Sequence, residues 1–162
     1  MSKKPLIMGI ETSCDETAAA IIQDDSSGIP KILSNSVSSQ FDVHKKFGGV
    51  VPDLAARAHV EKIDLIVKEA LMKSKKSLND IDAVAATAGP GLIVCLSVGL
   101  NFAKALSLSL NKPFIGVNHL EGHALSPKLQ TKLDYPYLLL LISGGHSQFL
   151  CVNGLGDYKR LG

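Results

Sequence analysis

Residues 6–22 read LIMGIETSCDETAAAII, and they set the architecture of the chain. The two ends of this segment, Leu6–Ile10 and Ala18–Ile22, are short apolar runs with the length and composition typical of β-strands. The residues between them, Glu11–Thr17, are polar or small and predict a connecting loop. A third strand is predicted at Lys31–Ser38, after a polar turn. The chain is therefore expected to begin with an antiparallel meander of three strands.

Helices and strands alternate after this meander. A helix is predicted from Pro52 to about Lys73, because proline suits a first helical turn and apolar residues then recur at helical spacing. A buried strand at Ile81–Thr87, a second helix ending near Leu110 and a strand at Phe114–Asn118 follow. The apolar positions expected to face the core are Ala56, Val60, Ile63, Val67 and Ala70 in the first helix, and Leu96, Leu100, Ala103, Leu106 and Leu110 in the second. The order βββαβαβ favours parallel pairing with helices on the faces of the sheet.

The strand pattern then starts again. Tyr137–Ser143 and Gln148–Val152 are apolar strands joined by a glycine-rich polar turn, and Asp157–Leu161 is a candidate third strand. This repetition predicts an α/β fold with two similar lobes. The first lobe, of order βββαβαβα, is expected over residues 1–133, and the incomplete beginning of a second lobe is expected over residues 134–162. Because no helix remains to cover the last strands, the chain is expected to be a fragment of a longer protein.

The composition limits the class of protein. The 162 residues carry 17 basic and 15 acidic side chains, and 46% of them are apolar. These values are typical of a globular protein and exclude a disordered acidic tail or a polybasic arm that binds nucleic acid. The three cysteines form no Cys-x-x-Cys pair and fit a reduced compartment, so a cytoplasmic location is expected. The longest apolar run, Leu138–Ile142, is much shorter than the about 20 residues that a membrane span needs, and no signal segment is recognised, so a soluble protein is expected.

His119 and His123 are the first candidates for chemistry. They follow a predicted strand and are four residues apart, which places both imidazoles on one face of a helix. Two such imidazoles can chelate a divalent transition metal, with a carboxylate or waters completing the shell. An ordinary pair of surface histidines is the alternative. A zinc-protease motif is disfavoured, because Glu121 lies two residues after His119 instead of one.

Two polar loops are further candidates. In Ser143–Ser147, paired glycines could bring backbone N–H groups close to an anion, and a plain hairpin turn is the alternative. In Glu11–Thr17, carboxylates and hydroxyls could hold a ligand's phosphates or a metal-bound water, and a solvated hairpin tip is the alternative. Arg57 and His59 could face an anion or RNA, but the pattern around them favours a solvated helix face. The Gly-Pro-Gly turn at residues 89–91 lacks the Lys-Ser/Thr pair of a phosphate-binding P-loop.

Six short motifs, taken in order, resemble those of one enzyme family. They are GIETSCDET at residues 9–17, GGVVP at 48–52, AH at 58–59, GPGL at 89–92, NHLEGH at 118–123 and SGGH at 143–146. Together they resemble the tRNA N6-adenosine threonylcarbamoyltransferases, the TsaD family, formerly described as O-sialoglycoprotein endopeptidases. The resemblance runs from Leu6 to the last residue and covers the first half of a family member.

This resemblance implies an actin-like ATPase (ribonuclease H-like) fold and a reaction. The reaction transfers the threonylcarbamoyl group from threonylcarbamoyl-adenylate to N6 of the adenosine 3′ of the anticodon, in tRNAs that read codons beginning with A. It implies that His119 and His123 bind one Fe²⁺ or Zn²⁺. The loop implied to bind the substrate consists of Ile142, Ser143, Gly144, Gly145 and His146. Glu11 and Asp15 are the candidate catalytic residues, which would orient the attacking amine or a water.

The resemblance also implies partners. These are tRNA, threonylcarbamoyl-adenylate, a smaller paralogue of the same fold and an ATPase subunit, without a membrane. The chain alone is expected to be inactive, because the family's third metal ligand, an aspartate, and most of its nucleotide contacts belong to the second lobe. Two other readings stay open: a non-catalytic paralogue that serves as a dimer partner, and a metalloprotease.

Overall fold

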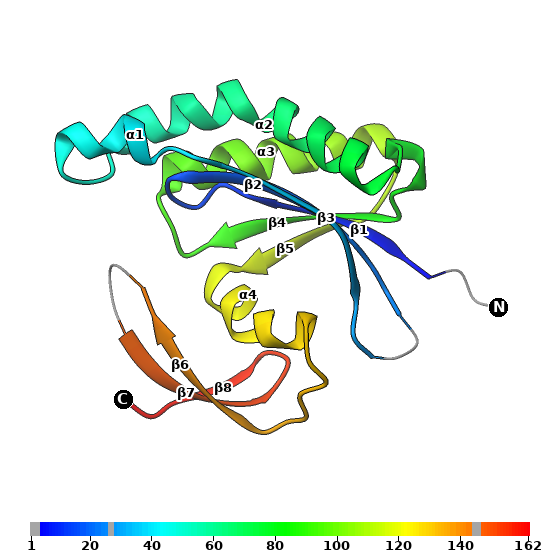
Figure 1. The fold of residues 1–162 in the computed structure, drawn as a ribbon, viewed down its shortest axis with the longest axis vertical. Helices are drawn as coiled ribbons and strands as arrows, with labels where there is room; N and C mark the ends of the chain where they lie inside the picture. The colour runs from blue at the N-terminus through cyan, green and yellow to red at the C-terminus, as the bar shows by residue number, and fades with distance from the viewer. Residues whose placement is uncertain (1–3, 26–27, 144–146) are drawn as a thin grey trace.

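The computed structural model describes residues 4–25, 28–143 and 147–162. The described residues form two β-sheets (Figure 1). The first has the order β3-β2-β1-β4-β5, and its strands are β1 (Leu6–Glu11), β2 (Glu16–Gln23), β3 (Lys31–Ser39), β4 (Ala83–Gly89) and β5 (Phe114–Asn118). The second has the order β6-β7-β8, and its strands are β6 (Tyr137–Ile142), β7 (Ser147–Gly154) and β8 (Asp157–Arg160).

The first sheet combines an antiparallel meander with parallel strands. Strands β1, β2 and β3 pair antiparallel, whereas β1 pairs parallel with β4, and β4 with β5. The predicted α/β fold is thereby confirmed, with one change at the first loop. Strand β1 continues through Glu11 and β2 begins at Glu16, so the connection is only Thr12–Asp15. The loop is shorter than predicted because Glu11 pairs with Ala18, and because Glu16 and Thr17 pair with β3.

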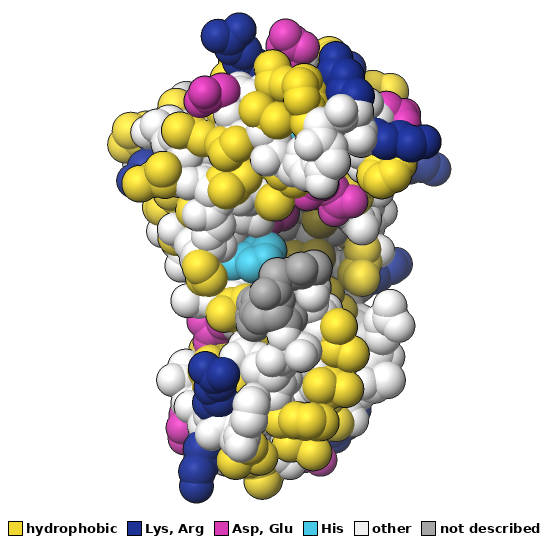
Figure 2. Space-filling model, turned by 90° about the vertical axis from the view of Figure 1, so that its left-hand side faces the viewer, with side chains coloured by type: hydrophobic (Ala, Val, Ile, Leu, Met, Phe, Trp, Pro, Cys, Tyr) yellow, Lys and Arg dark blue, Asp and Glu magenta, His cyan; other side chains and the backbone are white. Residues whose placement is uncertain are grey.

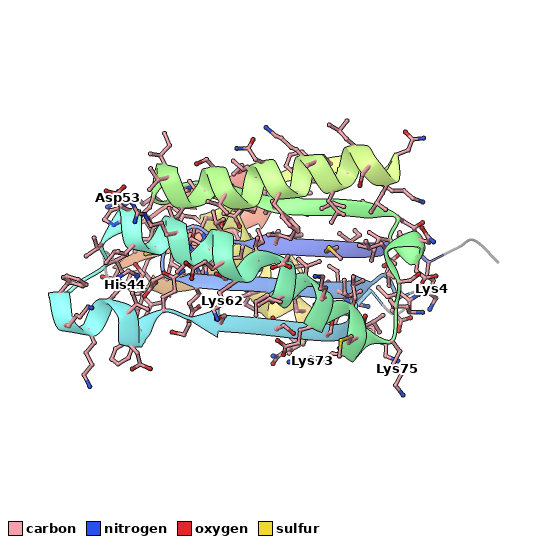
Figure 3. The ribbon with its side chains drawn as sticks, turned by 90° about the horizontal axis from the view of Figure 1, so that it is seen from above. Lys4, His44, Asp53, Lys62, Lys73 and Lys75 are labelled. Carbon is pink, nitrogen blue, oxygen red and sulfur yellow. The ribbon has the colours of Figure 1, made fainter. Side chains whose placement is uncertain are left out.

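Two long helices cover one face of this sheet, and the core lies between them and the strands. Helices α2 (Pro52–Ser74) and α3 (Ile93–Leu110) lie side by side across the strands (Figures 1 and 3). Met8, Ile21 and Val84 point from the strands into this layer and are fully buried. Burying such apolar side chains is the main source of the free energy that holds the layers together. Shorter elements complete the chain: α1 (Phe41–His44), η1 (Lys45–Phe47), η2 (Leu78–Asp80), α4 (His119–Leu125) and η3 (Ser126–Leu129).

In the first half of α2, the buried face is shifted by one position from the prediction. Val60, expected in the core, is 63% exposed, whereas Ala55 and His59 are fully buried. Ala55, His59 and Ile63 follow one another at intervals of four, so they form a single row along the helix. The expectation that His59 lies on a solvated face was therefore wrong, because a polar side chain occupies a core position.

Helix α3 has the length and hydropathy of a membrane span. In the described part of the chain it alone passes this test, with a mean hydropathy of 1.7 over 18 residues. It packs against β4 and α2, which is the position of a covering helix in an α/β fold, and such helices pass the same test. The length and hydropathy of α3 are therefore only weak evidence that this helix spans a membrane.

Helix α4 lies between the two sheets (Figure 1). Its residue Glu121 accepts hydrogen bonds from the backbone N–H of Gly156, at 3.0 Å, and from the hydroxyl of Tyr158, at 2.7 Å. Burial and this carboxylate raise the pKa of Tyr158 to about 12, so the phenol keeps its proton and donates. The hydroxyl of Tyr137 donates to the carbonyl of Ala124 at 2.6 Å. These contacts fix the second sheet against α4. The predicted lobe boundary at residues 133 and 134 falls between η3 and β6 and stays a prediction.

Candidate functional site

The floor of the site is the short loop Thr12–Asp15, which is locked to α3. The hydroxyl of Thr12 donates to the carbonyl of Cys95 at 2.9 Å and accepts from the N–H of Gly99 at 3.1 Å. A Cβ at Gly99 would collide with that hydroxyl, so glycine lets the helix approach the loop. Thr12 is 2% exposed, and its hydroxyl is bonded to α3. This hydroxyl therefore stabilises the fold and is not available to a ligand.

The Gly-Pro-Gly turn holds the next residue of the same loop. The N–H of Leu92 donates to the carbonyl of Ser13 at 2.8 Å. A Cβ at Gly91 would lie 2.8 Å from that carbonyl oxygen, so only glycine fits there without a shift. The turn therefore acts as a support for the loop, as the absence of a P-loop sequence suggested.

Glu11 stands at the end of β1, and its carboxylate is fully engaged. Oε1 accepts a hydrogen bond from the N–H of Ser13, and Oε2 accepts one from the hydroxyl of Thr87. Burial by itself raises the pKa of Glu11, but these hydrogen bonds outweigh it and leave the pKa below its usual value. The side chain is therefore an ionised carboxylate, and Oε2 faces Nδ1 of His119 at 3.4 Å.

His119 and His123 turn their ring nitrogens toward each other. His119 is the first residue of helix α4 and His123 lies one turn further along it, and the side chain of Asn118 caps the N-terminus of this helix. The two Nε2 atoms are 3.1 Å apart, and the rings meet edge to face. The other nitrogen of His119, Nδ1, also lies 3.3 Å from the hydroxyl of Ser13. Because the carboxylate of Glu11 only accepts hydrogen bonds, it favours a proton on Nδ1 and leaves a lone pair on Nε2.

This pair of histidines fits a divalent metal. At metal–nitrogen bonds of about 2.0–2.1 Å, tetrahedral or square geometry requires two ligand nitrogens roughly 3 Å apart. A carboxylate behind the metal-binding histidine is the usual way to fix its orientation and raise its basicity. Across residues 4–25, 28–143 and 147–162, no cluster of three His, Cys, Asp or Glu side chains has metal-binding geometry. The described part of the site thus offers two imidazole nitrogens at the separation that a metal ion requires.

The histidines stand between two connected hollows. One, of about 360 Å³, is lined by Glu11, Asp15, Thr87 and both histidines among others. The second, of about 370 Å³, joins the same histidines and Gly91 to Ile142 and Ser143. In Figure 2 histidine side chains reach the surface at the waist between the two parts of the molecule. The structure therefore brings the first two residues of the predicted substrate loop to the histidines. Gly144, Gly145 and His146 lie outside the described residues.

Comparison with known proteins identifies the family. A family model of the tRNA N6-adenosine threonylcarbamoyltransferases, TsaD, matches residues 31–162. The chain belongs to this family. A tRNA N6-adenosine threonylcarbamoyltransferase of Pelagibacter ubique is 72% identical over all 162 residues, and one of Brucella anthropi is 60% identical over 156 residues. The chain covers 45% and 44% of those two proteins, so it spans about half the length of the curated relatives that it matches.

Solved structures agree on the fold. A protein titled YeaZ from Pseudomonas aeruginosa superposes with a TM-score of 0.62 at 15% identity, over 98% of this chain and 65% of that one. A Ppx/GppA family member from Aquifex aeolicus superposes with a TM-score of 0.53 at 14% identity, over 98% of this chain and 51% of that one. These neighbours have the actin-like ATPase fold, and the expected fold class is confirmed.

Two residues of the loop Thr12–Asp15, Cys14 and Asp15, have different environments. Burial, and then the neighbouring Asp15, raise the pKa of Cys14 to about 11, so its thiol stays protonated and is a poor nucleophile. Asp15 lines the hollow beside the histidines together with Glu11. The two predicted catalytic carboxylates are thus brought to one hollow, although Glu11 is already held by Ser13 and Thr87.

Glu121 and His59 lie outside this hollow. Glu121 lines a separate hollow with Gln148 and Tyr158 and is occupied by the contacts to β8, so it cannot assist a metal-bound water at the histidines. His59 lies beneath the loop, where its ring contacts Thr17 and the carbonyl of Cys14. Sequence reasoning missed His59. Its spacing of four residues from both Ala55 and Ile63 was the signal that it shares their buried row.

Proposed function

We propose that the protein containing this chain transfers a threonylcarbamoyl group from threonylcarbamoyl-adenylate to N6 of adenosine in tRNA. Family membership supports this reaction class. The observation that carries the proposal for this chain is the pair of Nε2 atoms 3.1 Å apart, backed by Glu11 and facing Ile142 and Ser143 across a hollow. Because the chain spans about half of its relatives, the activity is assigned to the whole protein.

His119 and His123 would hold one Fe²⁺ or Zn²⁺, because both metals accept imidazole nitrogen. When bound, the metal supplies a Lewis acid and a template for the oxygens of the donor. Glu11 acts behind His119: it keeps the proton on Nδ1 and so fixes the direction of the Nε2 lone pair. Glu11 is therefore assigned as a positioning residue.

Asp15 is the carboxylate assigned to the attacking amine. The exocyclic nitrogen of adenosine forms a bond to the carbamoyl carbon of the donor, and the carbon–oxygen bond to the phosphate breaks. AMP leaves with the electron pair of that bond, and the amine loses a proton. Asp15 lines the hollow at the histidines and is placed to orient the amine and accept this proton. Orientation of the two reactants supplies much of the rate in such a transfer.

The loop Ile142–His146 would bind the donor. Its first two residues border the hollow that contains the histidines. Half of a cleft cannot enclose the donor, so the 162 residues alone are proposed to be inactive. The division into a first lobe, residues 1–133, and the start of a second, residues 134–162, is part of the same proposal.

The direct test is a double substitution in the full-length protein. His119→Ala with His123→Ala should abolish threonylcarbamoyladenosine formation, measured by mass spectrometry of digested tRNA. Ser126→Ala, at the C-cap of the same helix, is the matched control, because its hydroxyl only returns to the carbonyl of His123. Undiminished product from the double variant, with the control equally active, would remove the histidines from the reaction.

The helix layer is the proposed contact face for a smaller paralogue of the same fold. Val60, Leu65 and Ile93 project from α2 and α3 and are 63%, 52% and 82% exposed. A groove of about 470 Å³ runs between these helices at Val60 and Phe102. Size-exclusion chromatography of the full-length protein with its paralogue should give a heterodimer that Ile93→Lys weakens. Separate elution of the two proteins at micromolar concentration argues against this partner.

An ATPase subunit and a cytoplasmic location complete the proposal, and the three free cysteines are compatible with that location.

The two other readings are disfavoured by particular residues. A non-catalytic paralogue has no need of paired histidines, yet His119 and His123 are both present and convergent. A metalloprotease of the His-Glu-x-x-His type needs a glutamate at the metal-bound water, and Glu121 is bound to Gly156 and Tyr158 instead.

A further inference from the structure

We propose that His59, in its neutral Nε2–H form, is a positioning residue that fixes the loop Thr12–Asp15 beneath the candidate active site. The geometry that carries this is a chain of hydrogen bonds through His44, Gln40 and His59 to the carbonyl of Cys14. The proposal deepens the proposed function and rests on it only for the statement that this loop forms part of a reaction site.

The contact with Cys14 determines where the imidazole carries its proton. Nε2 of His59 is 3.0 Å from the carbonyl oxygen of Cys14, and a carbonyl can only accept. Nε2 therefore donates. Nδ1 lies 2.8 Å from the hydroxyl of Thr17 and 3.2 Å from Nε2 of Gln40, and both of these groups can donate to it. With the ring neutral, every polar atom of this fully buried side chain is satisfied in one tautomer.

The direction of the bonds continues away from His59 without conflict. The amide nitrogen of Gln40 that faces His59 also lies 3.4 Å from the carbonyl of Ala55, so it must be the donor end of the amide. The amide oxygen then accepts from Nε2 of His44 at 3.0 Å. Nδ1 of His44 in turn accepts from the N–H of Val51 at 3.3 Å. The hydrogen bonds therefore run in one direction. They start at the N–H of Val51, pass through the side chains of His44, Gln40 and His59, and end at the carbonyl of Cys14.

This chain joins three segments that are distant in sequence. Val51 is the N-cap of α2, Gln40 precedes α1, and Cys14 belongs to the loop at the candidate site. In Figure 3, His44 and Asp53 lie at the same end of the helix layer, and Lys73 and Lys75 lie toward the other end. The backbone N–H of Gln40 adds a direct bond to the carbonyl of Asp15 at 2.9 Å. The carbonyls of Cys14 and Asp15 therefore both accept hydrogen bonds from this network. These bonds fix the backbone from which the side chain of Asp15 extends.

The matched variants are His59→Gln and His59→Asn, measured in the intact protein. The glutamine amide reaches about as far as Nε2 and can still donate to Cys14, whereas the shorter asparagine reaches only to the position of Nδ1. Both lose part of the ring's packing, so similar losses of thermal stability are expected. Hydrogen exchange of the backbone amides of residues 13–16 should rise about fivefold in H59N and less than twofold in H59Q, because one hydrogen bond contributes about 1 kcal/mol.

Two further readouts separate positioning from simple folding. Long-range ¹H–¹⁵N spectra of the histidine rings should show His59 neutral with its proton on Nε2 at pH 7. In the transfer assay, H59N should lower kcat more than tenfold with little change in KM for the donor, and H59Q should retain most of kcat. A charged or Nδ1–H ring, or equal loop exchange and equal kcat in the two variants, would overturn the proposal. If neither variant nor wild type transfers the group, the exchange and tautomer results still decide the role of His59, and the proposed function fails separately.

Discussion

Two pairs of histidines, His44 with His59 and His119 with His123, lie near the loop Thr12–Asp15 in different surroundings. His44 and His59 are 4% and 0% exposed, and all of their ring nitrogens have hydrogen-bond partners in protein. His119 and His123 border an open hollow, and their Nε2 atoms face each other. Within the described part of the chain, Nδ1 of His119 is the only ring nitrogen of this second pair that has partners other than the opposite imidazole.

The comparison shows that the presence of histidine does not by itself mark a ligand site. What matters is whether a ring nitrogen is left without a hydrogen-bond partner in the protein. A buried ring with both nitrogens used contributes to stability and orientation, as a satisfied polar network does. A ring with one nitrogen fixed by a carboxylate and the other turned to an open space is prepared to bind something there. The experiments below exploit this contrast, starting with the largest expected effect.

Metal binding should distinguish the two pairs completely. The 162-residue chain is expected to bind Zn²⁺ with micromolar or weaker affinity, because two imidazoles form an incomplete shell. His119→Ala with His123→Ala should remove this binding in isothermal titration, whereas His44→Ala should leave it in place. Submicromolar affinity in a strictly monomeric chain would mean that the shell is complete without further ligands, contrary to this account.

Folding stability should distinguish them in the opposite sense. His59→Ala leaves the carbonyl of Cys14 and the hydroxyl of Thr17 without their partner and opens a cavity, so a loss of about 2–4 kcal/mol in the free energy of unfolding is expected. His123→Ala removes an exposed ring and should change that free energy by less than about 0.5 kcal/mol. Urea unfolding followed by circular dichroism measures both. Equal losses in the two variants would contradict the contrast drawn here.

The sequence predicted the exposed pair and missed the buried one for a physical reason. His119 and His123 follow a strand and share a helix face, and both properties are local, so spacing was enough. The network of His59 depends on Gln40 and Cys14, which are 19 and 45 residues away and meet it only in the folded chain. The apolar stripe assigned to α2 placed Val60 inside, because hydropathy ranks valine above histidine although the core accepts a satisfied polar ring.

The strands and long helices were predicted to within two residues at most ends, because each has a continuous apolar pattern. Strand β1 gained Glu11 and β4 began at Ala83 instead of Ile81, where η2 ends. Helices α1 and η1 were not predicted, since seven residues with exposed Phe41 and Phe47 carry no helical periodicity. The second sheet followed the alternation of its strands, with Leu141 buried and Leu140 half exposed.

A smaller effect should come from the carboxylate behind the exposed pair. Glu11→Gln keeps the shape of the side chain but replaces an ionised carboxylate with a neutral amide. Its oxygen can still accept from the N–H of Ser13, whereas its NH2 group cannot accept from Thr87 or His119. Loss of a carboxylate behind a metal-binding histidine typically costs about tenfold or more in affinity, so Zn²⁺ affinity is expected to fall about tenfold. Thr87→Val is the control, because it removes a partner of Glu11 without changing the charge and should cost less. An unchanged affinity in E11Q would show that Glu11 does not act through His119.

The smallest effect is the dependence of stability on pH between 7 and 5. Burial lowers the pKa of His59 below 6.5, and the hydrogen bond to Cys14 only partly opposes this. Below pH 6.5 the unfolded chain therefore binds a proton that the folded chain still excludes, and the free energy of unfolding falls as the pH drops until the folded ring also titrates. Above 6.5 both states are neutral and His59 contributes no slope. Burial and the neighbouring His119 also lower the pKa of His123, so that residue adds a slope of the same sign.

Glu11 does not disturb this measurement, because its lowered pKa affects stability only as the pH falls below its usual value of 4.5. Subtracting the unfolding curves of H59Q from those of wild type at pH 7, 6 and 5 isolates the share of His59. The same subtraction for His123→Gln gives the exposed ring, which solvent can rehydrate when it is protonated, so its share should be smaller. The two substitutions could change the pH dependence of the free energy of unfolding equally, or H59Q could keep the full wild-type dependence. Either result would mean that the surroundings of His59 do not hold its ring neutral, and the electrostatic contrast between the two histidine pairs would be wrong.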